Sequence, residues 1–238
     1  MNQGIALVLF LIHFYSYSQM KTIIYCFPGQ GSDGRLFDSL TIHPDYELRV
    51  IEYGTPEKHA TMHSFAKQLA GQIDTTRRFI LMGVSLGGMI CSELSEIVKP
   101  EKTILISSAK NRNELPRRYK FQRAIPIYKL VPGSVMLAGA KMLQPIVEPD
   151  RASNKETFKS MLGRKESTYM RRTVGLIIRW PRTSNSTRLY HIHGSNDHTL
   201  PIRHVVPTDV VEGGSHMMTL TRAQEVSVLI NKILDNTK

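Results

Sequence analysis

"ILMGVSLGGMI", residues 80–90, is an apolar run interrupted by glycines around a single hydroxyl. The apolar residues that lead into it, 78–83, are typical of a buried strand, and "GGMICSELSEIV", residues 87–98, is typical of a helix that ends before Pro100. A tight turn from strand to helix strains the backbone, so it needs small neighbours, and it exposes the serine side chain. Ser85 is therefore a candidate nucleophile, with a structural turn serine as the alternative.

A serine hydroxyl attacks efficiently only when a base removes its proton and an acid orients that base. Asp197 follows the predicted strand "TRLYHIHG", residues 187–194, and His216 lies in the glycine loop that follows the next predicted strand, 208–214. Serine, then aspartate, then histidine, each after a strand, is the chain order expected of this architecture. The sequence therefore predicts that Ser85, Asp197 and His216 act as a catalytic triad.

The charge that develops on a carbonyl oxygen under serine attack needs backbone donors. One candidate is the amide of Leu86, at the positive end of the helix that follows the serine. The loop "FPGQGSDG", residues 27–34, follows the first predicted strand and offers the amide of Gln30 between Gly29 and Gly31. The alternative for this loop is a Pro-Gly turn that only reverses the chain.

Short apolar runs alternate with segments of helical spacing along most of the chain. Strands built in this way, with helices between them, form βαβ units. The predicted fold class is therefore α/β, with a mostly parallel central sheet and helices on both faces. The runs predicted as strands are 21–27, 46–53, 78–83, 102–108, 187–194 and 208–214, and the predicted helices are 62–73, 87–98 and 222–234.

Residues 110–182 interrupt this alternation with helix-like pieces, among them 117–131 and 155–180. The segment holds 17 Lys and Arg against 5 Asp and Glu (+12), and the rest of the chain holds 14 against 15 (−1), which together give the net charge of +11. Such a basic surface favours an acidic substrate, an anionic surface or a phosphate-bearing acyl carrier, with a solvated helix face as the alternative. The aromatic residues are not interleaved with the basic ones, so no nucleic acid partner is expected.

The segments "PGQGSDG" (28–34), "GVSLGG" (83–88), "HGSND" (193–197) and "EGGSHMM" (212–218) together resemble the α/β-hydrolase superfamily, over roughly residues 21–236. The resemblance implies that residues 20–109 and 183–238 form the hydrolase core and that residues 110–182 form a basic helical cap over the site. The site residues that it implies are Ser85 as nucleophile, Asp197 as acid, His216 as base, and the Gln30 and Leu86 amides as oxyanion hole.

Two departures from this superfamily predict a trimmed sheet of six strands. Almost nothing precedes the first predicted strand, and only about nineteen positions separate Asp197 from His216, too few for a full helix between them. "FPGQGS" followed by "SLG" also resembles malonyl-carrier-protein transacylases. Those enzymes usually have a histidine directly before the serine, where this chain has Val84, so the α/β-hydrolase interpretation is favoured.

The first nineteen residues differ in composition from the rest of the chain. "GIALVLFLIHF", residues 4–14, is too short to span a bilayer but fits the core of a signal peptide, and Ser16 and Ser18 offer a small-residue cleavage site. Residues 1–19 are therefore interpreted as a signal peptide, and the protein as exported, periplasmic or secreted. The segment contains no Lys or Arg, so translation from Met20 and a cytoplasmic protein are the alternative.

The two cysteines and the histidine pair of residues 191 and 193 are interpreted as packing residues. Cys26 and Cys91 are too few for a disulfide framework and lie in apolar runs, where free cysteine fills a core. His191 and His193 face the same side of a predicted strand, and without a spaced set of Cys and His they do not indicate zinc. No cofactor, metal or stable membrane insertion is expected.

The function expected from these residues is a serine hydrolase that cleaves an ester-type acyl bond through an acyl-enzyme on Ser85. A carboxylesterase acting on a small acyl substrate is favoured, and the basic segment would favour an anionic one. The alternatives on the same triad are a thioesterase or acyltransferase and an aminoacyl peptidase. A further alternative is a binding protein that kept the hydrolase fold without catalysis.

Overall fold

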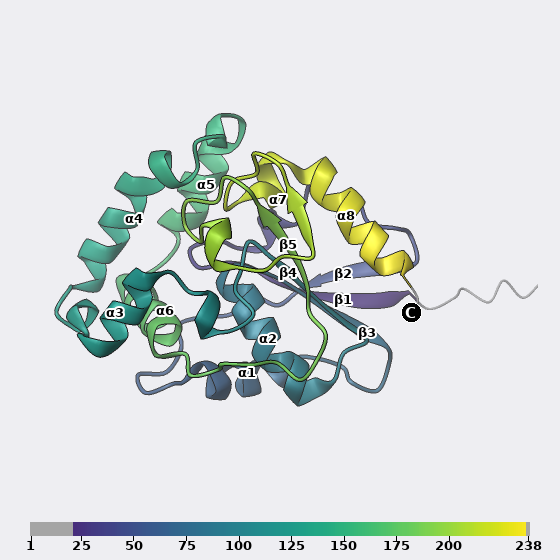
Figure 1. The fold of residues 1–238 in the computed structure, drawn as a ribbon, viewed down its shortest axis with the longest axis horizontal. Coiled ribbons are helices and arrows are strands. Elements are labelled where there is room, and N and C mark those ends of the chain that lie inside the picture. The colour runs from purple at the N-terminus through teal and green to yellow at the C-terminus, as the bar shows by residue number, and fades with distance from the viewer. Residues whose placement is uncertain (1–20, 237–238) are drawn as a thin grey trace, which may run out of the picture.

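The computed structural model describes residues 21–236, and Figure 1 shows them as a sheet flanked by helices. The leader, residues 1–19, lies outside the described residues. All neighbouring strands are parallel, in the order β2-β1-β3-β4-β5-β6, which confirms the predicted parallel sheet of six strands. The strands are β1 (Thr22–Phe27), β2 (Tyr46–Val50), β3 (Phe79–Val84), β4 (Lys102–Ile106), β5 (Tyr190–Gly194) and β6 (Asp209–Val211).

Helices cover both faces of the sheet because alternate strand residues point to opposite sides. Tyr25 and Leu81 belong to a core on one face, which α1 (Met62–Ala70) and α2 (Leu86–Val98) cover, whereas Cys26 and Met82 point into the core beneath α8 (Ala223–Asp235) on the other face (Figure 1). Between β6 and α8 lies the short helix α7 (Met218–Thr221). The strands β1 and β3 are nearly continuous apolar runs, as expected for strands buried on both faces.

The chain between β4 and β5 carries a helical insertion, residues 110–182, which shows no strand within the described residues. Its helices are α3 (Arg117–Ala124), α4 (Gly133–Val147), α5 (Lys155–Gly163) and α6 (Ser167–Arg179). The predicted helical piece 117–131 ends early because Pro126 disfavours helical backbone just before it. The piece 155–180 is broken between α5 and α6, and α4 was not predicted.

Both ends of this insertion are attached to α2. The main-chain amide of Arg112 donates to the carbonyl of Arg182 (2.9 Å), so the outgoing and returning chains lie side by side. Ser92 of α2 donates its hydroxyl to the carbonyl of Lys110 (2.6 Å) and accepts a hydrogen bond from the Asn185 side chain (2.7 Å).

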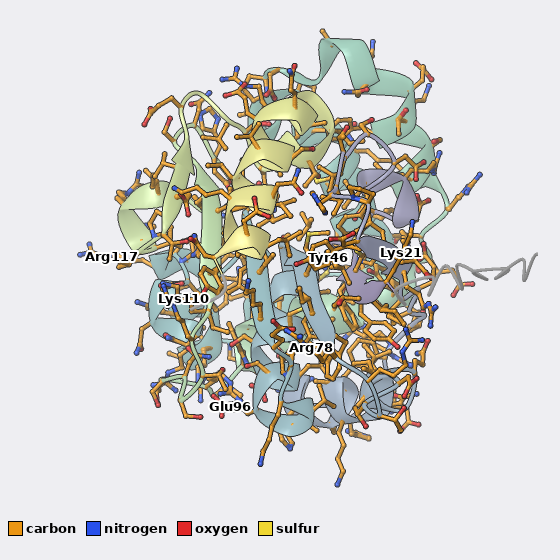
Figure 2. All side chains as sticks on the ribbon, turned by 90° about the vertical axis from the view of Figure 1, so that its right-hand side faces the viewer. Lys21, Tyr46, Arg78, Glu96, Lys110 and Arg117 are labelled. Atoms are coloured by element: carbon orange, nitrogen blue, oxygen red, sulfur yellow. The ribbon has the colours of Figure 1, made fainter. Side chains whose placement is uncertain are left out.

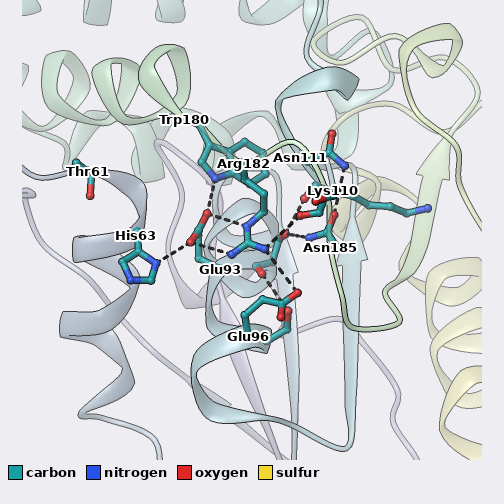
Figure 3. Close-up of polar contacts among 12 residues, drawn as sticks. Thr61, His63, Glu93, Glu96, Lys110, Asn111, Trp180, Arg182 and Asn185 are labelled. Atoms are coloured by element: carbon teal, nitrogen blue, oxygen red, sulfur yellow. Dashed lines mark hydrogen bonds and ion pairs between the residues drawn. The ribbon is translucent and has the colours of Figure 1, made fainter.

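Glu93, one residue further along α2, binds the returning chain (Figure 3). Its buried carboxylate accepts hydrogen bonds from the Trp180 indole and the Arg182 guanidinium, both at 2.8 Å, and contacts the His63 ring at 3.0 Å. Burial alone would raise the pKa of Glu93, but these donors outweigh it and lower the pKa. The insertion is therefore attached to α2 through an ionised carboxylate.

The insertion covers the carboxyl edge of the sheet. Figure 2 views the molecule from the side that faces away from the insertion, where Lys21, Tyr46 and Arg78 mark the starts of β1, β2 and β3. Parallel strands that start here all end at the far edge, which is where open α/β sheets bind their ligands. No helix within residues 21–236 has both the length and the apolar composition needed to cross a membrane.

Gly87, in the first turn of α2, lets this helix pack directly against the end of β1. A Cβ at this position would collide with the carbonyl oxygen of Phe27 and lie 2.6 Å from that of Pro28. Backbone atoms cannot move aside as a flexible side chain can. By contrast, nothing lies within 4 Å of a Cβ added to Gly139, which also lies within a helix, α4.

We expect Gly87→Ala to lower the free energy of unfolding by about 3 kcal/mol or more, because the helix must shift away from the strand. Gly139→Ala, the matched control, is expected to be neutral or to stabilise by about 0.5–1 kcal/mol through its higher helix propensity. Denaturant unfolding of the two variants measures both values. A Gly87→Ala protein as stable as the Gly139→Ala protein would contradict the close approach.

Candidate active site

Ser85 lies between the last residue of β3 and the first of α2, with a backbone conformation of φ 52° and ψ −117°. This region is sterically unfavourable for residues with a Cβ and is found where the surrounding structure enforces it. The amide of Ser85 donates to the carbonyl of Ile106 (2.9 Å), and its carbonyl accepts from the Ser108 hydroxyl (2.6 Å). The turn thus presents the Ser85 side chain at the carboxyl edge of the sheet.

The structure brings Ser85 together with the two other residues predicted from the sequence. His216 Nε2 lies 2.8 Å from the Ser85 hydroxyl oxygen, and its Nδ1 lies 2.7 Å from Asp197 Oδ2. The other carboxylate oxygen of Asp197 accepts hydrogen bonds from the amides of Thr199 (2.8 Å) and Leu200 (2.7 Å). Both oxygens of the buried Asp197 are therefore paired, and its orientation toward the imidazole is fixed.

Asp197 and His216 each stabilise the charged form of the other. Burial alone would raise the pKa of Asp197, but the His216 imidazole and the hydrogen bonds to the carboxylate lower it. Burial would likewise lower the pKa of His216, but the charge of Asp197 and its hydrogen bond raise it. An ionised Asp197 thus stabilises the imidazolium that forms when His216 takes up a proton.

The loop after β1 approaches Ser85 closely. A Cβ added to Gly29 would lie 3.3 Å from the Ser85 Cβ, so a larger residue would crowd the site. The side chain of the adjacent Gln30 donates a hydrogen bond to the Thr173 hydroxyl of α6 (2.6 Å), which ties this loop to the insertion. Leu86 is the first residue of α2, directly after the serine, so the helix begins one residue earlier than the predicted 87–98.

Glu148, at the end of α4, is a site residue that the sequence analysis missed. Its side chain is buried, and Oε2 accepts a hydrogen bond from the amide of Met217 (3.1 Å), the residue after His216. Burial raises the pKa of Glu148 to about 7, and its charge contributes to the raised pKa of His216. Nothing in the sequence distinguishes Glu148 from the other acidic residues of the insertion, because only the packing of α4 brings it close to His216.

His191 and His193 support the loop that carries Asp197. His193 Nε2 bonds to the carbonyl of Leu200 (2.7 Å), and its Nδ1 to the ring of His191 (3.1 Å). Burial lowers the pKa of both histidines. No group of three or more His, Cys, Asp or Glu within residues 21–236 is arranged to hold a metal ion.

A cavity of about 330 Å³ opens beside Ser85 between the core and the insertion. Most of its walls are apolar, and none of the described residues that form them is Lys or Arg. The positive charge of the insertion therefore does not line this cavity. The walls are Gln30, Gly31, Ser85, Met89, Tyr119, Ala140, Leu143, Gln144, Glu148, Phe158, Met161, Leu162, Met170, Ile177, Thr199, Leu200, His216 and Met217.

The strained backbone at Ser85 predicts an unusual effect on stability. Ser85→Gly is expected to be more stable than Ser85→Ala by about 1–2 kcal/mol, because glycine adopts this conformation without steric cost. Both variants lack the hydroxyl, so its loss cannot explain a difference in their free energies of unfolding. Denaturant unfolding checks it, and equal stability of the two variants would show that Ser85 is not strained.

The raised pKa of Glu148 predicts how stability depends on pH. A carboxyl group whose pKa is about 7 in the folded state, above its unfolded value, destabilises the fold progressively as pH rises from about 4.5 to about 7. Glu148→Gln should therefore gain stability relative to the unchanged protein across this range, by an amount on the order of 1–3 kcal/mol. Unfolding measured at several pH values tests this, with Glu156→Gln, an exposed carboxylate of α5, as the control. An identical gain in the two variants would contradict the assignment.

Comparison with known proteins gives the family of this fold. Among solved structures, the enol-lactonase from Burkholderia xenovorans LB400 is similar over 90% of this chain and 91% of its own, with a TM-score of 0.70 and 14% identity. A thermophilic esterase from Thermogutta terrifontis matches over 90% of both chains, with a TM-score of 0.66 and 15% identity. The RedJ thioesterase from Streptomyces coelicolor matches over 89% of both chains, with a TM-score of 0.59 and 11% identity. At these identities the likeness shows the fold alone. No curated protein matches the sequence. The alpha/beta hydrolase family matches residues 9–228, and the chain belongs to this family.

Proposed function

We propose that this protein is a serine hydrolase that cleaves an ester-type acyl bond through an acyl-enzyme on Ser85. The observation that carries the proposal is the continuous hydrogen-bonded chain from the Ser85 hydroxyl through His216 to Asp197, with distances of 2.8 and 2.7 Å. A nucleophile, a base and an orienting acid within hydrogen-bond reach are what acyl transfer requires. The raised pKa of His216 favours its action as the base.

The proposed reaction begins when His216 removes the proton of Ser85 and the serine oxygen attacks the carbonyl carbon. The amides of Gln30 and Leu86 are proposed to bind the resulting oxyanion, and His216 then returns its proton to the leaving alcohol. Water deprotonated by His216 attacks the acyl-enzyme and releases the acid. The first turn of α2 adds its positive end to the stabilisation of the oxyanion.

The cavity walls support an apolar acyl group rather than a charged one. Methionine and leucine side chains dominate the walls, and the acidic Glu148 close to His216 disfavours an anionic group there. Among the reactions open to this triad, we propose a carboxylesterase that acts on small apolar acyl groups. The neighbours of similar fold include an esterase, an enol-lactonase and a thioesterase, which agrees with hydrolase chemistry in general and does not decide between these reactions.

A fluorophosphonate probe tests the catalytic serine against the alternative of a non-catalytic binding protein. The folded protein should be labelled once, and Ser85→Ala should lose the label and about 10⁴-fold or more of its p-nitrophenyl ester hydrolysis, because the nucleophile is gone. Ser39→Ala, which removes an exposed serine that lines neither cavity, is the control and should behave like the unchanged protein. Labelling or turnover that survives Ser85→Ala would overturn the proposal, and a series of p-nitrophenyl esters then measures the acyl-chain preference.

A further inference from the structure

A second cavity, of about 690 Å³, lies on the insertion and shares no wall residue with the cavity beside Ser85. It is formed by the loop before α1, the segment between α3 and α4, the first turn of α4 and one face of α6 along its length. Its size is within the range of small-molecule sites. The walls are Lys58, His59, Tyr128, Lys129, Pro132, Gly133, Ser134, Ser167, Thr168, Arg171, Arg172, Gly175 and Arg179.

Five cationic side chains converge on this cavity: Lys58, Lys129, Arg171, Arg172 and Arg179. No Asp or Glu is among the described residues of the walls, and none of the five cations forms an ion pair with a carboxylate in residues 21–236. Cations on a solvated surface usually spread apart or alternate with acids. A concave cluster without acids instead produces a strongly positive potential.

The arginines are held in place by groups that leave their charge uncompensated. Arg171 donates to the carbonyl of Lys129 (2.7 Å), and Arg172 donates to the carbonyl of Pro56 (2.7 Å). Arg179 donates to a carbonyl within α6 (3.1 Å). A neutral carbonyl fixes the direction of a guanidinium without neutralising it, so the arrangement is organised before an anion arrives.

The first turns of α4 and α6 meet at the same cavity. A Cβ on Gly133, at the start of α4, would collide with the carbonyl oxygen of Ser167, at the start of α6. Neither helix has an acidic residue in its first turn or a side chain that caps its amides, although Glu166 directly precedes α6. The positive end of α4 therefore adds to the five cations, and the hydroxyls of Ser134 and Thr168 offer further donors.

We infer that this cavity binds a phosphate-bearing small molecule that carries more than one negative charge. Guanidinium groups and helix amides match phosphate oxygens, and the volume exceeds that needed for a single phosphate group. The buried ring of Tyr128 provides a flat apolar wall for the rest of such a ligand. The site accounts for part of the excess positive charge of the insertion, which the cavity beside Ser85 does not use.

The two cavities lie on opposite sides of α6. Met170 and Ile177 line the cavity beside Ser85, whereas Arg171, Arg172 and Arg179 line the basic one. Binding of the anion therefore requires no group of the triad. The inference goes beyond the proposed ester hydrolysis and can be tested without it.

Calorimetric titration with inorganic pyrophosphate tests the site. The unchanged protein and Ser85→Ala should bind it equally, with one-to-one stoichiometry and an affinity that falls as salt rises. The double variant R171Q/R172Q should bind about tenfold or more weakly, because two charge-assisted contacts are lost. K155Q/K159Q, which removes two exposed lysines of α5 outside the cavity, changes the net charge equally and should bind like the unchanged protein.

A second variant keeps the test valid if R171Q/R172Q does not fold. Ser134→Glu leaves every arginine contact intact and places a carboxylate in the cavity, so it should also weaken pyrophosphate binding by about tenfold or more. Titration with citrate distinguishes a phosphate site, which prefers pyrophosphate, from a general site for polyvalent anions. Absence of saturable binding, equal weakening in K155Q/K159Q, or a preference for citrate would overturn the inference.

Discussion

The backbone of Ser85 is held at a positive φ of 52° by hydrogen bonds to β4 and the residues just beyond it and by the packing of α2. Its amide and carbonyl bond to β4 and to Ser108 just beyond it, and Gly87 allows α2 to press against the end of β1. The cost of such a conformation is on the order of 1–3 kcal/mol, which a well-packed sheet can offset. Every other feature of the site is placed relative to this turn, because it sets where the hydroxyl points and where α2 begins.

Much of the core was predictable because its signals are local. Strands buried on both faces, such as β3, are continuous apolar runs. Ser85, Asp197 and His216 each lie within five residues of the end of a strand, so a parallel sheet must bring their loops to one edge. Glu148 was not predictable, because its position depends on how α4 packs. The break between α5 and α6 and the hydrogen bond from Gln30 to Thr173 likewise depend on tertiary contacts that no local pattern encodes.

Helix α6 separates two environments of opposite character. One of its faces contributes Met170 and Ile177 to the cavity beside Ser85, and another contributes three arginines to the basic cavity. The charge count of residues 110–182 identified an excess of cations but could not say which face carried them. The basic side chains of the insertion and the apolar walls of the cavity beside Ser85 lie on different sides of one helix.

The two ends of the insertion are hydrogen-bonded to each other through Arg112 and Arg182, and both are attached to α2 through Ser92 and Glu93. Because the insertion leaves and re-enters the core at adjacent positions, it can be replaced by another segment without distorting the core. The replacement only needs ends that lie equally close together. Closing that gap with a short turn would cost little chain entropy. Such an exchange would leave β3, the turn at Ser85 and α2 unchanged.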